Sequence, residues 1–150
     1  SRPPMSTERS DPAASGYVHG FTQREQERLR HQARFLEQRV HEGLPFARCR
    51  ELLEVGCGVG AQTEILLRRF PDLRVTGVDA SAPNLAAARA HLDAQPWHAG
   101  RYELLQQNAE ALDFPSNRFD GAFLCWILEH VKSPARVLAE VRRVLRPGSP

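Results

Sequence analysis

The stretch LLEVGCGVGAQTEILLRRF, residues 52–70, constrains the fold more than any other part of the chain. An apolar run ends at Gly56, Gly58 and Gly60, and a helical pattern begins directly after them. A strand that turns into a helix through glycines brings its backbone close to a ligand, because glycine carries no obstructing side chain and adopts positive φ. Amides at a helix start also favour negative charge. We predict a ligand-binding turn here, and an ordinary tight turn between strand and helix is the alternative.

After residue 45 the chain alternates between short apolar runs and helical patterns. The expected strands are residues 51–55, 74–79, 102–106 and 119–125, and the expected helices are residues 61–70, 83–94 and 134–146. A strand followed by a helix, repeated, predicts an α/β fold with a Rossmann-like, doubly wound parallel sheet. Ligands of such sheets bind at the carboxyl ends of the strands.

We expect the chain to divide into an arm, a helical segment and a domain. Residues 1–16 are rich in proline, serine and charge, which is typical of a disordered arm. Residues 17–45 form an N-terminal helical segment, in which Thr22 to Glu25 fit a capping box. Residues 46–150 form the cofactor-binding α/β domain. One face of the N-terminal helix would carry Leu29, Ala33, Leu36 and Val40.

The composition narrows the classes of partner and compartment. A formal net charge of +2 is too small to indicate a nucleic acid or a membrane surface as partner. No apolar run approaches the ~20 residues of a membrane span. The cysteines form no CxxC pair and the histidines share no spacing, so we expect no metal site and no disulfide framework. A reducing, cytoplasmic location fits these features.

Two acidic residues near the glycines, Asp79 and Glu54, indicate the class of cofactor. Asp79 ends the second expected strand, where a carboxylate accepts hydrogen bonds from ribose hydroxyls; a helix cap or turn residue is the alternative. Gly56, Gly58 and Ala61 satisfy the dinucleotide fingerprint. However, Glu54 lies two residues before the first glycine and would repel a pyrophosphate. A ligand with an ammonium and a sulfonium group fits this acid better.

Several motifs now indicate a family. LLEVGCGVGAQTEIL resembles the first motif of class I S-adenosylmethionine-dependent methyltransferases, and VTGVDAS resembles their second-strand motif. QQNAEALDFPSNRFDGAFLCWILEHVKSPARVLAEVRRVLRPG resembles the next motifs of the small-molecule branch. The resemblance covers residues 17–148. It implies S-adenosylmethionine as cofactor, S-adenosylhomocysteine as product, a small-molecule methyl acceptor, and a sheet ordered third, second, first, fourth strand.

The resemblance also implies which residues hold the methionine end of the cofactor. The backbone around Gly56, Cys57 and Gly58 would face this end. Glu54 would orient the methionine end of the cofactor, either directly or through a water molecule. Cys125, at the end of the fourth strand, would offer its backbone carbonyl to the ammonium group.

The nucleoside end would lie against the next two loops. Asp79 would hold the ribose hydroxyls, with Ala80 beside the adenine. Asn108 and Ala109 match the positions that read the adenine amino group and ring nitrogen; for Asn108 a turn residue is the alternative. Tyr17 would close over the cofactor from the N-terminal segment.

Two residues after the fourth strand are candidates for catalysis. Methyl transfer from a sulfonium depends mainly on proximity and alignment. An oxygen or nitrogen acceptor that must lose a proton needs a base, and an imidazole suits this role. Glu129 and His130, in CWILEHV, lie where the methyl group would point, with His130 as the general base. A helix start or a packing contact is the alternative.

The chain departs from the family at its end. It carries four expected strands and stops at RVLRPGSP, where relatives continue into a fifth strand, so we interpret it as truncated. The stretch FDGAFLCWIL would then be an unpaired edge, which predicts self-association by edge pairing or exchange of the N-terminal helix. A non-catalytic cofactor-binding or interaction module is the main alternative function. A nicotinamide dehydrogenase is less favoured, because Glu54 has no role in it.

Overall fold

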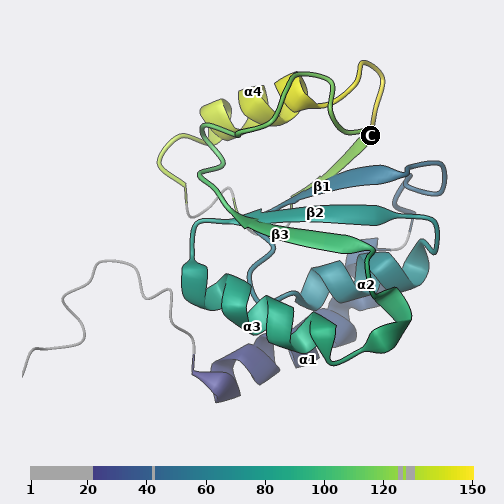
Figure 1. The fold of residues 1–150 in the computed structure, drawn as a ribbon, viewed down its shortest axis with the longest axis vertical. Helices are drawn as coiled ribbons and strands as arrows, with labels where there is room; N and C mark the ends of the chain where they lie inside the picture. The colour runs from purple at the N-terminus through teal and green to yellow at the C-terminus, as the bar shows by residue number, and fades with distance from the viewer. Residues whose placement is uncertain (1–21, 42, 125–126, 128–130) are drawn as a thin grey trace, which may run out of the picture.

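The fold was analysed in a computed structural model, which describes residues 22–41, 43–124, 127 and 131–150. Parallel strands form a single sheet in the order β3-β2-β1-β4 (Figure 1). The strands are β1 (Glu51–Val55), β2 (Arg74–Asp79), β3 (Tyr102–Gln106) and β4 (Gly121–Leu124). The predicted fold class and strand order are confirmed.

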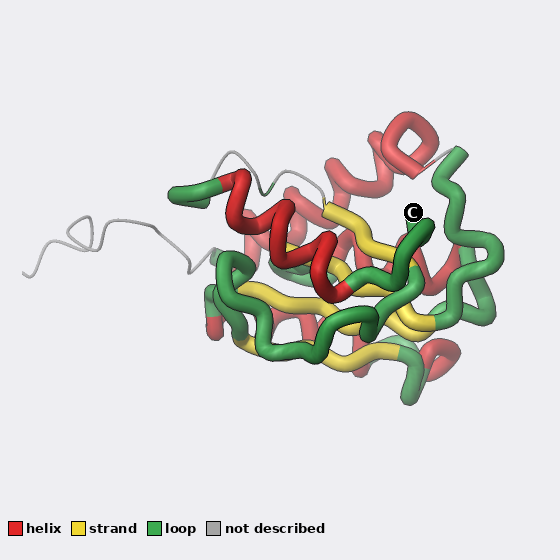
Figure 2. The backbone as a smooth tube through the Cα atoms, turned by 90° about the horizontal axis from the view of Figure 1, so that it is seen from above, coloured by secondary structure: helices red, strands yellow, loops and turns green. Residues whose placement is uncertain are grey.

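Helices cover both faces of the sheet, as the doubly wound architecture requires (Figures 1 and 2). The helices are α1 (Gln23–His41), α2 (Ala61–Arg69), α3 (Ala82–Asp93), the short 3-10 helix η2 (Pro96–His98) and α4 (Pro134–Val144). Figure 1 shows α1, α2 and α3 on one side of the sheet and α4 on the other. No helix in the described part of the chain is long and apolar enough to cross a bilayer.

The core has two halves, one on each face of β1. Leu52 packs with residues of α2 and α3, such as Leu66 and Leu92, while Val55 packs with Val137 of α4. The alternation arises because successive side chains of a strand point to opposite faces. A central parallel strand is therefore apolar on both faces, which explains the continuous apolar run in the sequence.

The register brings the carboxyl ends of the strands together. Val55 lies opposite Val78 and Leu124, and Asp79 lies opposite Gln106. Because every pair is parallel, the loops that follow the strands leave from the same edge of the sheet. The glycine loop and the loop after Asp79 therefore become neighbours.

The fourth strand begins two residues later than its sequence indicates. The carboxylate of Asp120 accepts hydrogen bonds from the backbone amides of Arg50 (3.0 Å) and Glu51 (2.9 Å). Residue 120 is thereby held against the loop before β1, and the strand proper starts at Gly121. On its outer side, the amide of Ala122 donates to the carbonyl of Pro150 at 2.9 Å.

The N-terminal helix starts at its predicted cap and packs on the body with both apolar and charged side chains. The hydroxyl of Thr22 accepts a hydrogen bond from the amide of Glu25 at 3.2 Å. Ala33 is buried, whereas Phe35 is 83% exposed. Charged side chains of α1 bind side chains of α2, and one of them reaches the glycine loop.

Candidate functional site

The glycine loop turns sharply between β1 and α2. Gly58 and Gly60 have φ angles of 53° and 83°, which side-chain-bearing residues rarely adopt. A Cβ atom on Gly60 would lie 3.2 Å from the Cβ of Ala88 in α3, so this glycine also permits a close approach of loop and helix. A Cβ atom on Gly58 would meet none of the described residues within 4 Å. The backbone at Gly58 is therefore open to a ligand.

Hydrogen bonds fix the loop to the neighbouring strand. The amides of Gly56 and Cys57 both donate to the carbonyl of Val78, at 2.8 and 3.1 Å. The amide of Gly60 donates to the carbonyl of Cys57 at 3.0 Å, which closes a tight turn over residues 57–60. The loop is thus held in shape without a ligand, which favours binding because little ordering is required.

Asp79 connects the glycine loop to the start of α3. Its Oδ2 accepts a hydrogen bond from the amide of Gly58 at 2.9 Å, and its Oδ1 accepts one from the amide of Ser81 at 2.8 Å. Each carboxylate oxygen has a second lone pair. The half-buried side chain can therefore serve the turn and still accept hydrogen bonds from two hydroxyls of a ligand.

Glu54 is a buried acid beneath the loop. Its side chain is 2% exposed, and the hydroxyl of Thr63 in α2 donates a hydrogen bond to it. Burial raises the pKa of Glu54 to about 8, and the carboxylate of Asp79 adds to this rise while Thr63 opposes it. A cation brought to this side chain would favour its ionised form.

The thiol of Cys57 is buried behind the glycine loop. The side chain is buried beside Gly77, where an added Cβ atom would lie 3.0 Å from the Cβ of Cys57. Burial, with the carboxylates of Glu54 and Asp79, raises the pKa of this thiol well above its ordinary value. The thiol stays protonated at neutral pH and is a poor nucleophile.

The loop after β3 forms a turn at the same edge. The Oδ1 of Asn108 accepts a hydrogen bond from the amide of Glu110 at 2.9 Å, and its carbonyl accepts one from Ala111 at 3.0 Å. Ala109 is buried, while Asn108 is exposed. The turn role expected as the alternative for Asn108 is present, and its NH2 group is left to donate elsewhere.

Comparison of the sequence with known proteins identifies a family. A family model described as a methyltransferase domain matches residues 53–149. The chain is 39% identical over 98 residues to a demethylmenaquinone methyltransferase of Symbiobacterium thermophilum, covering 65% of this chain and 39% of that protein. It is 32% identical over 114 residues to an O-methyltransferase of Aspergillus nomiae, covering 76% of this chain and 50% of that protein.

A solved structure agrees with these matches. A S-adenosylmethionine-dependent methyltransferase of Methanosarcina mazei superposes with a TM-score of 0.58 at 30% identity, covering 66% of this chain and 49% of that one. The chain belongs to the class I S-adenosylmethionine-dependent methyltransferases. It spans 39% to 50% of the length of the two curated relatives above. Membership in this family implies S-adenosylmethionine as the cofactor.

The methyltransferase chain brings most of its predicted cofactor residues to one edge of the sheet. The described ones follow the ends of β1, β2 and β3, apart from Glu54, which lies within β1, and Asp79, which is the last residue of β2. Four predicted residues lie outside the described part, namely Tyr17, Cys125, Glu129 and His130. Ile127 is described, and an added Cβ atom on Gly56 would lie 2.8 Å from its Cδ1. Ile127, three residues after the end of β4, therefore lies against the glycine loop.

Sequence reasoning missed the residues that support this site from a distance. Thr63, the partner of Glu54, and Ser81, whose amide donates to Asp79, lie at helix starts and inside the two quoted motifs, yet neither was among the predicted site residues. The spacing of Thr63 from the glycines is the signal that could have identified it, because the first turn of α2 must face β1. Within the described residues, no group of three or more His, Cys, Asp or Glu side chains could hold a metal ion.

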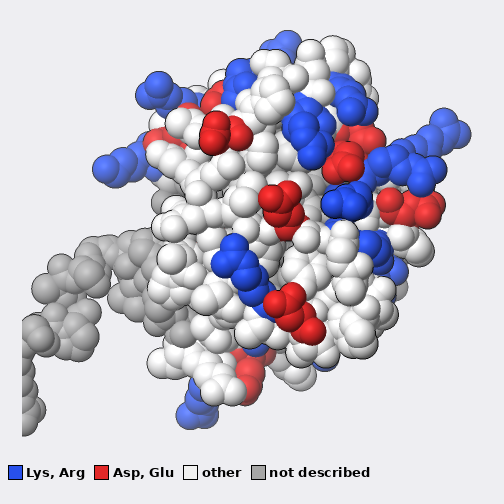
Figure 3. Space-filling view, viewed as in Figure 1, with Lys and Arg blue, Asp and Glu red and all other residues white. Residues whose placement is uncertain are grey.

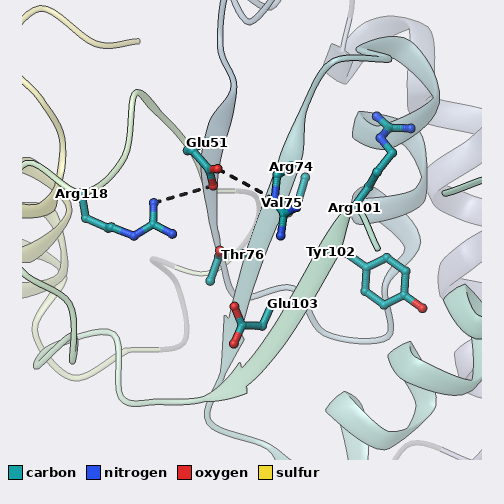
Figure 4. A pocket seen from close by; sticks show the side chains of 8 residues that line it. All are labelled: Glu51, Arg74, Val75, Thr76, Arg101, Tyr102, Glu103 and Arg118. Carbon is teal, nitrogen blue, oxygen red and sulfur yellow. Dashed lines mark ion pairs between the residues drawn. The ribbon is translucent and has the colours of Figure 1, made fainter. Parts of the chain in front are cut away.

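A hollow at the other end of the strands is a poorer candidate for the methyltransferase site. It lies where β1, β2 and β3 begin, and Figure 4 shows Glu51 between Arg74 and Arg118. The carboxylate of Glu51 lies 3.8 Å from Arg74 and 3.6 Å from Arg118, so it offsets part of their positive charge. Figure 3 likewise shows positive and negative side chains interspersed on one face of the molecule.

Proposed function

We propose that this chain binds S-adenosylmethionine at the carboxyl edge of its sheet and forms the cofactor-binding part of an enzyme that methylates a small molecule. The observation that carries the proposal is the arrangement of Asp79. This carboxylate bridges the amides of Gly58 and Ser81, next to a stretch of backbone that has open space before it.

Each end of the cofactor has a matching group. The ribose hydroxyls would donate to the free lone pairs of Asp79. The amino-acid end would lie over the loop at residues 56–58, where Glu54 beneath the loop would favour its ammonium group. The adenine would lie between Ala80 and the 108–109 turn, with the Ala109 amide and the Asn108 side chain available to its ring edge.

The catalytic step would be an in-line transfer of the methyl group from sulfonium to acceptor. The protein would supply proximity and orientation. His130, with Glu129 beside it, would remove a proton from an oxygen or nitrogen acceptor, since the segment that carries them follows β4 and Ile127 of that segment lies by the glycine loop. One of the two curated relatives is named for demethylmenaquinone and the other only as an O-methyltransferase, so the proposal names only a small molecule.

Titration calorimetry with S-adenosylhomocysteine tests the cofactor proposal. We expect micromolar binding by this chain and a loss of at least about tenfold in Asp79→Ala. Asp113→Ala, which removes an exposed carboxylate from another loop, is the matched control and should bind like the parent. Thermal melting of each variant verifies folding. A folded parent that binds reduced nicotinamide dinucleotide, and not S-adenosylhomocysteine, would overturn the proposal.

A methylation assay separates the enzyme from a non-catalytic binding module. The assay uses a longer form of the protein beside this chain, with a panel of oxygen, nitrogen and carbon acceptors. Transfer that is lost in Asp79→Ala and reduced in His130→Ala supports the enzyme. Binding of cofactor without transfer to any acceptor supports the binding module.

A further inference from the structure

One contact of α1 differs in kind from the others. Arg34 pairs with Glu64 at 3.1 Å, and Glu37 pairs with Arg69 at 3.1 Å, so these contacts join side chain to side chain. Arg30 instead donates to two backbone carbonyls, those of Val59 (3.3 Å) and Ala87 (3.2 Å). A backbone carbonyl, unlike a side chain, does not change place when a side-chain rotamer changes. The Arg30 guanidinium therefore binds the main chain directly.

The two carbonyls lie where the glycine loop meets α3. Val59 directly precedes Gly60, and Ala87 directly precedes Ala88. Gly60 and Ala88 are the residues that approach so closely that an added Cβ atom would lie 3.2 Å from its neighbour. Arg30 therefore spans the point of closest approach of the loop and the helix that follows Asp79.

The peptide unit between Val59 and Gly60 is held at both of its polar ends. Its carbonyl accepts from Arg30, and its N–H donates to the carbonyl of Cys57 at 3.0 Å. This peptide closes the turn over residues 57–60, and Gly58 lies inside that turn with its amide bonded to Asp79. The carbonyl of Cys57 and the amide of Gly58 belong to one planar peptide unit, so a rotation of the Val59–Gly60 peptide would remove a hydrogen bond that holds the Gly58 amide in its direction.

We propose that Arg30 is a positioning residue, by which α1 sets the geometry of the glycine loop for the cofactor. The inference rests on the proposed cofactor site but adds a residue that no loop motif contains. It predicts that α1 tunes cofactor affinity through one side chain, while the other ion pairs of α1 only fasten the helix to α2.

Calorimetry on matched methionine variants tests this role. Arg30→Met keeps the length of the side chain and removes its donors, and Arg34→Met makes the same change one turn along α1. We expect Arg30→Met to weaken S-adenosylhomocysteine binding by about fivefold to tenfold, and Arg34→Met by less than about twofold. Arg30→Lys keeps a donor and should recover part of the loss. Equal losses in the two methionine variants, or none in Arg30→Met, would overturn the inference.

Amide hydrogen exchange supplies a second readout that needs no cofactor. The amide of Gly60 should exchange about fivefold faster, or more, in Arg30→Met than in the parent. Its exchange rate should be unchanged in Arg34→Met. If the parent binds no S-adenosylhomocysteine, the proposed function fails, and the exchange comparison alone decides whether Arg30 holds the loop. If Arg30→Met does not fold, the exchange and binding of Arg30→Lys are compared with those of Arg34→Lys, where only the first should change.

Discussion

At the scale of single residues, Glu54 is the clearest case in which a buried group links structure to pH. Its pKa of about 8 in the folded protein lies above its ordinary value of 4.5, chiefly because of burial. Between these values the unfolded chain has released the proton that the folded protein keeps. The folded state then binds more protons, so stability falls as the pH rises through this window.

Glu54→Gln should therefore remove part of the pH dependence of stability. The glutamine keeps an oxygen that accepts from Thr63 but has no proton to lose. We expect the free energy of unfolding of the parent to fall by up to about 1.4 kcal/mol per pH unit relative to this variant, between about pH 5 and pH 8. Urea unfolding across this range measures the difference. Glu103→Gln, an exposed change, should run parallel to the parent.

His98 gives the opposite dependence. It is 0% exposed between the rings of Trp97 and Tyr102, and both of its ring nitrogens lack a hydrogen-bond partner among the described residues. Burial lowers the pKa of His98, an effect to which Arg101 and His91 add and which Glu64 opposes. The unfolded chain therefore gains a proton first on acidification. Stability is complete above about pH 6.5 and falls as the pH drops toward the lowered pKa.

Replacement by an aromatic residue without a titrating group tests this prediction. His98→Phe should lose less stability than the parent when the pH is lowered from about 7 to about 5. His31→Phe changes an exposed histidine of α1 and should keep the acid sensitivity of the parent. Chemical unfolding at the two pH values measures both variants. Equal acid sensitivity in His98→Phe and the parent would contradict the assignment.

At the scale of elements, the glycine loop and α3 are fitted to one another. Gly60→Ala would destabilise the fold in two ways. Alanine is strained at a φ of 83°, and its Cβ atom would lie too close to the atoms of Ala88. Gly100→Ala is a matched control, because Gly100 has a φ of 76° and nothing within 4 Å of its added Cβ atom. We expect Gly100→Ala to cost about 1 kcal/mol and Gly60→Ala about 1 to 3 kcal/mol more, as measured by denaturant unfolding.

The other elements follow rules that can be read locally. Proline and glycine end the helices, and a serine followed by a proline begins α4 at Pro134. The bounds of β1, β2 and β3 agree with the sequence-based prediction, and those of the helices agree within two residues. The start of β4 was missed because the side chain of Asp120 binds the amides of Arg50 and Glu51 at the start of β1, and those lie far away in sequence.

At the scale of the whole molecule, the free edge of β4 matters most. In the strand order β3-β2-β1-β4, and within the described part of the chain, β4 has a neighbouring strand on one side only. On its other side the amide of Ala122 donates a hydrogen bond to the carbonyl of Pro150. Exposed strand edges pair with other chains. We propose that the chain of 150 residues self-associates through this edge.

Sedimentation over a range of concentrations tests the association. We expect the average mass to rise with concentration, and to rise further when residues 146–150 are deleted, because the deletion removes the carbonyl that covers Ala122. A monomer at all concentrations in both forms would contradict the proposal. Association that is lost when residues 1–45 are removed would instead indicate exchange of the N-terminal helix.

The sequence by itself determined the class of fold, the order of elements and the loops that meet at the candidate site. These properties depend on periodicity, on glycine and proline, and on a short motif with Asp79, all of which act within a few residues. Only the tertiary structure decided that Arg30 binds the glycine loop, that Thr63 binds Glu54 and that His98 is buried. Each of these features depends on residues from different elements. The packing of the helices on the sheet brings such residues together, and the residues beside them in the chain do not determine it.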